Sequence, residues 1–238
     1  THPAAGTELN KIVVLFHDIY GFGLPNTRHA TDYMAGHGFL AVMPNTLGDD
    51  SWDENRSLAS EDFGAWWVRA QLLFPQMSSD PHFYEQVDEN FPLVLSTIKK
   101  VTSHLKSAYP SQPIGAMGFC WGGRQIDLIA RHPVNEVHIG AGALLHAGLM
   151  DGPSITNALF PLKFIVTEDD AVKFPEKYER TVQAVADVKA ANGLVHEVVL
   201  YKGMQHGFAN RGNYKDEHEW SETKRARDEA AEWLKKNL

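Results

Sequence analysis

The sequence contains a single cysteine, Cys120, in a segment that could make it a nucleophile. Residues 118–122 read GFCWG, which fits the G-x-S-x-G pattern of a nucleophile elbow with sulfur in place of the serine oxygen. Such an elbow turns sharply from a strand into a helix whose N-terminal N–H groups point at the sulfur and favour a thiolate. The alternative is a glycine-rich turn that holds an inert, buried cysteine.

Two later segments could supply the other members of a catalytic triad. The apolar run 164–166 is followed by the acidic stretch 167–170, and the run 198–200 is followed by a glycine-flanked loop that contains His206. The order cysteine, carboxylate, histidine is that of hydrolases built around a nucleophile elbow. Because strand ends of an open parallel sheet meet at one crevice, we expect the three groups to converge there. Taken singly, they could be a turn aspartate and a solvated histidine.

These groups together would perform nucleophilic acyl transfer. His206 would hold or take the thiol proton, a carboxylate would fix the imidazole tautomer, and the thiolate of Cys120 would attack a carbonyl carbon. Backbone N–H groups then have to stabilise the oxyanion. We expect one from Trp121, which directly follows the nucleophile, and the other from Ile19 in the glycine-bearing loop 17–23.

The elements that position these residues can be predicted from the apolar pattern. Strands are predicted at 12–16, 39–44, 114–119, 137–145, 162–166 and 195–200, and the first two runs are typical of strands buried on both faces. Amphipathic spacing and helix-ending residues predict helices at 26–38, 63–74, 83–109, 121–131, 174–191 and 217–238. This alternation predicts an α/β fold with a mostly parallel central sheet and helices on both faces. No repeat or linker composition appears, so we expect one domain over residues 1–238.

The composition narrows the classes of partner. The 238-residue chain has a net charge of −8 and no long basic run, which argues against a nucleic-acid or anionic-membrane partner. No segment approaches the ~20 apolar residues that span a bilayer. Residues 1–10 are too polar for a signal peptide, and a single cysteine allows no intrachain disulfide. We therefore expect a cytoplasmic protein, and the sequence leaves open whether it is a monomer or a homodimer.

Four segments together resemble one known family. They are residues 18–28 (DIYGFGLPNTR), 118–123 (GFCWGG), 168–170 (EDD) and 206–211 (HGFANR). In this combination the chain is similar to the dienelactone hydrolase family, and to its carboxymethylenebutenolidase-like branch in particular. The resemblance covers essentially the whole chain and implies the α/β-hydrolase fold.

The resemblance also implies an activity and a set of roles. Members of the family open cyclic enol lactones or esters with a Cys–Asp–His triad and without a metal or organic cofactor. Carried over by position, Cys120 is the nucleophile, His206 the base and Asp170 the acid. Asp169 is the alternative acid, because the segment that follows is one residue longer than the family pattern.

The sequence departs from the family pattern at the substrate-binding positions. Bacterial members carry a glutamate where this chain has Asp18, and they use two arginines for the substrate carboxylate. Arg211 matches one arginine, whereas Arg69 is only a weak counterpart of the other. We expect Asp18 and Arg211 to border the same pocket as Cys120. The alternative for Arg211 is a surface ion pair with a residue such as Asp216 or Glu217.

Other interpretations of the sequence are possible beside an ester or lactone hydrolase. Twelve histidines could suggest a metal, but no H-x-x-x-H or H-E-x-x-H spacing occurs, so we expect none. His146 could face the crevice or the surface. The same fold could cleave a pathway-specific lactone, for example a polyketide-derived one, or a carbon–carbon bond. It could also bind a small molecule without turning it over.

Overall fold

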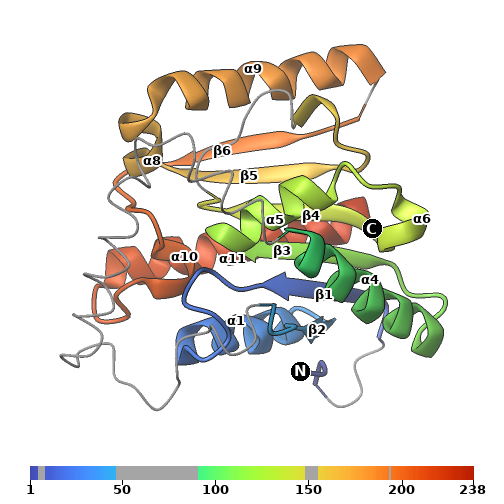
Figure 1. Cartoon of the computed structure of the whole chain (residues 1–238). Coiled ribbons are helices and arrows are strands. Elements are labelled where there is room, and N and C mark those ends of the chain that lie inside the picture. The colour runs from blue at the N-terminus through green and yellow to red at the C-terminus, as the bar shows by residue number, and fades with distance from the viewer. Residues whose placement is uncertain (5–8, 47–90, 148–154, 193) are drawn as a thin grey trace.

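Six parallel strands form the sheet in the computed structural model, which describes residues 1–4, 9–46, 91–147, 155–192 and 194–238 (Figure 1). The strands are β1 (Lys11–Phe16), β2 (Phe39–Val42), β3 (Ile114–Phe119), β4 (Ile139–Leu145), β5 (Leu162–Thr167) and β6 (Glu197–Tyr201). Their order across the sheet is β2-β1-β3-β4-β5-β6, and every neighbouring pair is parallel. The predicted α/β architecture is therefore confirmed.

Helices cover both faces of this sheet because each central strand is apolar on both sides. In β1, Ile12, Val14 and Phe16 join one core cluster, whereas Val13 and Leu15 join the other. The first cluster includes side chains of α4 (Phe91–Ala108), α5 (Trp121–Ile129) and α9 (Pro175–Asn192). The second includes side chains of α1 (Pro25–Gly36) and α11 (Glu217–Asn237). Figure 1 shows the sheet running between these two sets of helices.

Three short helices modify the predicted element boundaries. They are α6 (Val134–Val137), α8 (Glu168–Lys173) and α10 (Phe208–Arg211). Because α6 occupies the start of the predicted strand 137–145, that strand begins two residues later, after His138 in a left-handed conformation with φ 55°. The predicted helix 63–74 and residues 83–90 of the predicted helix 83–109 lie outside the described residues.

The α8 helix starts directly at the end of β5 because Thr167 caps it. The Thr167 hydroxyl oxygen accepts a hydrogen bond from the N–H of Asp170 at 3.1 Å. The acidic residues 168–170, expected at the end of a strand, are thus the first turn of a helix, where negative charge is favourable. None of the helices in the described part is both long and apolar enough to cross a membrane.

Candidate active site

Cys120 lies at a strained turn between β3 and α5. Its φ of 52° and ψ of −117° are unusual for a residue with a side chain. A Cβ atom at Gly118 would lie 2.6 Å from the carbonyl carbon of Gly122, and one at Gly122 would lie 2.5 Å from the carbonyl oxygen of His17. Both glycines are therefore required by close backbone approach, which matches the geometry predicted for a nucleophile elbow.

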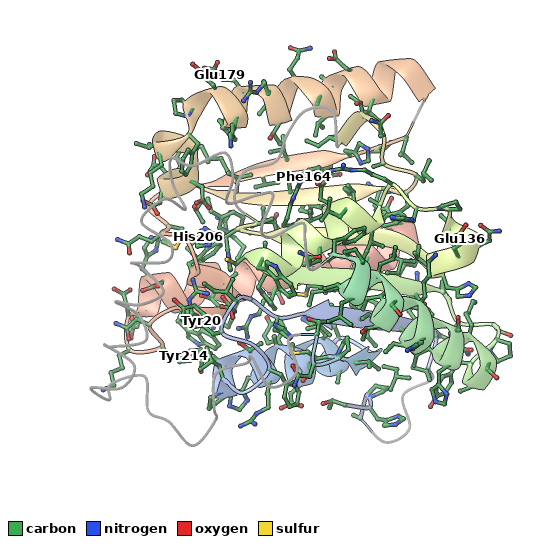
Figure 2. The ribbon with its side chains drawn as sticks, in the orientation of Figure 1. Tyr20, Glu136, Phe164, Glu179, His206 and Tyr214 are labelled. Atoms are coloured by element: carbon green, nitrogen blue, oxygen red, sulfur yellow. The ribbon has the colours of Figure 1, made fainter. Side chains whose placement is uncertain are left out.

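His206 lies between Cys120 and a carboxylate. Its Nε2 is 3.1 Å from the Cys120 sulfur, and its Nδ1 is 3.0 Å from both carboxylate oxygens of Asp170. Figure 2 shows His206 at the same end of the sheet as Tyr20, whose loop follows β1. The structure thus brings together three segments that are 86 and 36 positions apart in the chain. This geometry is that of a nucleophile, a base and an orienting acid.

The two candidate acids point in different directions. Asp170 faces the imidazole, and its carboxylate also accepts a 2.7 Å hydrogen bond from the Thr167 hydroxyl. Asp169 instead pairs with Lys173 at 2.9 Å and accepts the main-chain N–H of His206 at 3.4 Å. Asp170 is therefore placed to hold the ring, and Asp169 to hold the backbone that carries it.

The site favours a protonated imidazole on His206. Burial would lower the pKa of His206, but the negative charge of the Cys120 sulfur and the hydrogen bond to Asp170 outweigh burial and raise this pKa to about 10. The side chain of His206 keeps 28% of its surface exposed, so a substrate can approach it. The raised pKa therefore favours an imidazolium that faces the Cys120 sulfur.

The raised pKa of His206 predicts an alkaline limit to hydrolysis. The imidazolium can protonate a leaving group below its pKa and cannot above it, so kcat/KM should fall as the pH rises through about 10. A pH profile of kcat/KM for an aryl ester, corrected for spontaneous hydrolysis, checks this. Asp169→Asn is the control and should keep the same limit, whereas a wild-type limit near neutral pH contradicts the raised pKa of His206.

The two proposed oxyanion donors belong to segments that meet at the elbow, since the carbonyl oxygen of His17 approaches Gly122. Trp121 is the first residue of α5, so its N–H has no acceptor within that helix. Ile19 follows β1, in the loop whose carbonyls approach Gly122. Within the described part of the chain, no hydrogen bond uses the N–H of Ile19 or Trp121. Both donors are therefore available to a ligand.

Asp18 and Arg211, both expected to border the pocket of Cys120, form a buried ion pair with each other. Asp18 has no exposed surface, and its carboxylate accepts hydrogen bonds from Arg211, from the amide of Asn210 at 2.9 Å and from the N–H of Tyr20 at 3.0 Å. Asp18 therefore holds Arg211 in place and has no surface left to offer a substrate.

Arg211 remains close to the nucleophile. Its guanidinium pairs with Asp18, and not with the surface acids considered as alternatives, and it lies 4.7 Å from the centre of the Tyr20 ring. Burial would lower the pKa of Arg211, but the charges of Asp18 and of the Cys120 sulfur raise it. The side chain is 22% exposed, so a charged group beside the sulfur stays within reach of solvent.

Sequence reasoning assigned no role to several residues that surround the triad. His146 is fully buried, with its ring centre 5.1 Å from that of His206, so it faces inward. Burial, followed by the positive charges of His206 and Arg211, lowers the pKa of His146 well below its usual value. Asn210 holds Asp18, and His17 contacts Thr46. In the sequence, Asn210 lies within a segment that resembles the family, and His17 lies directly before another.

No metal cluster is found near these residues. Across the described ranges, no group of three or more histidine, cysteine, aspartate or glutamate side chains could hold a metal ion. Arg69, the weak candidate for a second substrate-binding arginine, lies outside the described residues.

Known proteins are similar to this chain over most of its length. The sequence model of the dienelactone hydrolase family matches residues 3–238. The carboxymethylenebutenolidase homolog of Rattus norvegicus is 27% identical over 206 residues, which cover 86% of this chain and 73% of the relative. The homolog of Xenopus tropicalis is also 27% identical, over 98% of this chain and 84% of the relative.

Solved structures show the same fold. A Klebsiella pneumoniae protein assigned to the dienelactone hydrolases superposes with a TM-score of 0.69 at 21% identity, covering 98% of this chain and 90% of that one. The dienelactone hydrolase of Anabaena variabilis superposes with a TM-score of 0.62 at 14% identity, covering 100% and 89%. The chain therefore has the α/β-hydrolase fold and belongs to the dienelactone hydrolase family, as a hydrolase of esters or lactones.

Proposed function

We propose that this protein hydrolyses small carboxylic esters or lactones through a thioacyl-enzyme on Cys120. The observation that carries the proposal is the 3.1 Å contact between the Cys120 sulfur and Nε2 of His206, with Asp170 3.0 Å from Nδ1 of the same ring. A cysteine at a strained elbow with a buried acid behind its histidine is the arrangement that activated nucleophiles use. No cofactor is needed for this reaction.

In the first half of the reaction, the thiolate of Cys120 forms a bond to the carbonyl carbon and the carbonyl oxygen becomes an oxyanion. The N–H groups of Ile19 and Trp121 stabilise that charge, a contribution of about 3 kcal/mol for each well-placed donor. Collapse of the intermediate breaks the carbon–oxygen bond of the ester, and the imidazolium of His206 gives its proton to the leaving oxygen. In a lactone, the leaving oxygen stays attached as the new hydroxyl.

In the second half, neutral His206 removes a proton from a water molecule, and the resulting hydroxide attacks the thioester carbon. The carbon–sulfur bond breaks, the acid product leaves, and the thiolate of Cys120 again faces an imidazolium. Asp170 accepts the Nδ1–H of the ring throughout, which keeps Nε2 toward the sulfur and stabilises the positive charge.

We propose further that Arg211 attracts substrates with a carboxylate, while Asp18 holds the guanidinium. Arg211→Gln should therefore raise KM for carboxylate-bearing lactones about tenfold more than for neutral aryl esters. Because this substitution leaves Asp18 buried without its cation, the double variant Asp18→Asn/Arg211→Gln is measured beside it. Steady-state kinetics on both substrate types check the prediction, and equal changes in KM for both types contradict it.

A chemical block of the thiol tests the proposed function in the wild-type protein. A panel of aryl esters and lactones is assayed before and after alkylation with iodoacetamide, which has a single cysteine to modify. We expect the unmodified protein to turn over at least one substrate class, and this activity should fall in proportion to the fraction of protein that is alkylated. Turnover that survives complete alkylation contradicts the cysteine mechanism. A chain that binds the panel without turnover is instead a binding protein that has kept the fold.

A further inference from the structure

The ring of His17 is fully buried and links three parts of the site. It lies at the end of β1, one residue before Asp18 and two before Ile19. Its Nε2 accepts the main-chain N–H of Thr46 at 3.1 Å, and the Thr46 hydroxyl lies 3.0 Å from the same nitrogen. The loop after β1 is thereby tied to the segment after β2.

The hydrogen bonds define which nitrogen of His17 carries its proton. Because Nε2 accepts an N–H, the proton is on Nδ1, and Nδ1 donates to the carbonyl oxygen of Asp18 at 2.8 Å. Burial also lowers the pKa of His17. The neutral ring therefore fixes the peptide unit that joins Asp18 to Ile19, and the nitrogen of that peptide unit is the N–H of Ile19.

The same ring packs on the nucleophile elbow. The rings of His17 and Trp121 are stacked, with their centroids 5.7 Å apart and their planes 17° from parallel. The carbonyl oxygen of His17 also approaches the first turn of α5 so closely that Gly122 has no room for a Cβ atom. His17 is thus linked to both proposed donors. Its Nδ1 binds the peptide unit that carries the N–H of Ile19, and its ring stacks on the ring of Trp121.

We propose that His17 is a positioning residue that sets the distance and direction of the Ile19 and Trp121 N–H groups relative to the Cys120 sulfur. This role rests on the proposed function, because it matters only if an oxyanion forms at that place. The side chain does not touch the substrate, and it acts through the two donors. Displacement of a positioned group by about 1 Å can cost about 100-fold in rate.

The test separates oxyanion stabilisation from the reactivity of the thiolate. His17→Phe keeps a ring to stack on Trp121 and removes the hydrogen bonds to Asp18 and Thr46. We expect kcat/KM for a neutral aryl ester to fall about 10- to 100-fold, mainly in kcat, because a misplaced donor costs transition-state stabilisation. The rate of Cys120 alkylation by iodoacetamide should stay within about threefold, since displacement of iodide forms no oxyanion.

Two further variants keep the proposal open to refutation if His17→Phe folds poorly. His17→Gln offers an acceptor to the Thr46 N–H, so its kcat should be at least about threefold higher than that of His17→Phe. His196→Phe is the matched control. His196 is also buried, and it accepts the main-chain N–H of Leu162 at 2.9 Å. It lies where β5 and β6 begin, at the end of the sheet opposite to the candidate site. We expect this control to change thermal stability and to leave kcat/KM within about threefold.

Two results would overturn the role of His17. One is hydrolysis by His17→Phe and His17→Gln at the wild-type rate. The other is a parallel fall of hydrolysis and alkylation, which would show that the elbow itself is damaged. Failure of the proposed function gives a different result, because wild-type turnover would then survive complete alkylation of Cys120.

Discussion

Replacement of Cys120 by alanine is expected to reduce kcat/KM for esters and lactones by about 10⁴-fold or more, since removal of the nucleophile of a triad leaves only binding and oxyanion stabilisation. The expected size of the effect follows from the structure, in which one sulfur lies 3.1 Å from the imidazole and the chain has no second cysteine to replace it. Purified variant and wild type are compared on the same substrates, with thermal unfolding as the check on folding.

Cys120→Ser is the matched variant for this loss. It keeps a nucleophilic atom at the elbow, but a hydroxyl is not ionised at neutral pH and depends on proton removal by His206 during the attack. We expect serine to retain more activity than alanine and far less than cysteine. Hydrolysis by Cys120→Ala within tenfold of the wild-type rate would contradict the role of the sulfur.

Asp170→Asn is expected to lower kcat by about 10³-fold or more, because loss of the orienting carboxylate from a triad leaves the imidazole in the wrong tautomer. Asp170 is 3.0 Å from Nδ1 of His206, and its own position is fixed by the Thr167 hydroxyl. An asparagine amide at this place can donate to Nδ1, which would put the ring proton on Nε2, beside the sulfur. Single-turnover and steady-state kinetics measure the loss.

Asp169→Asn is the control for the neighbouring carboxylate. Asp169 pairs with Lys173, and its contact with His206 is to the backbone N–H and not to the imidazole. We therefore expect kcat within about fivefold of wild type. A larger loss from Asp169→Asn than from Asp170→Asn would reverse the assignment of the acid.

Much of the fold could be predicted from local patterns. Apolar segments indicated all six described strands, and the continuous runs are clearest in strands that are buried on both faces, such as β1. The errors lie at element ends. The α8 helix follows β5 without a loop because Thr167 caps it, and α10 has only four residues, from Phe208 to Arg211, too few for a periodic signal.

The candidate site was partly predictable for a similar reason. The elbow glycines and the histidine loop are short motifs, so Cys120 and His206 could be identified from sequence alone, and position within the family favoured Asp170. The partners of Asp18 and His17 could not be identified in this way. Arg211 lies 193 positions from Asp18, and Thr46 lies 29 positions from His17. No local pattern encodes pairs that only the fold brings together.

The most direct measurement is mass spectrometry of the protein quenched with acid during turnover of an activated aryl ester. We expect a covalent adduct of one acyl group on the peptide that contains Cys120. The adduct should form before product release and disappear when the substrate is exhausted. The adduct should be absent from Cys120→Ala. Steady turnover with no acyl group on Cys120 at any quench time, or an acyl group on another residue that turns over at the catalytic rate, would contradict the thioacyl mechanism.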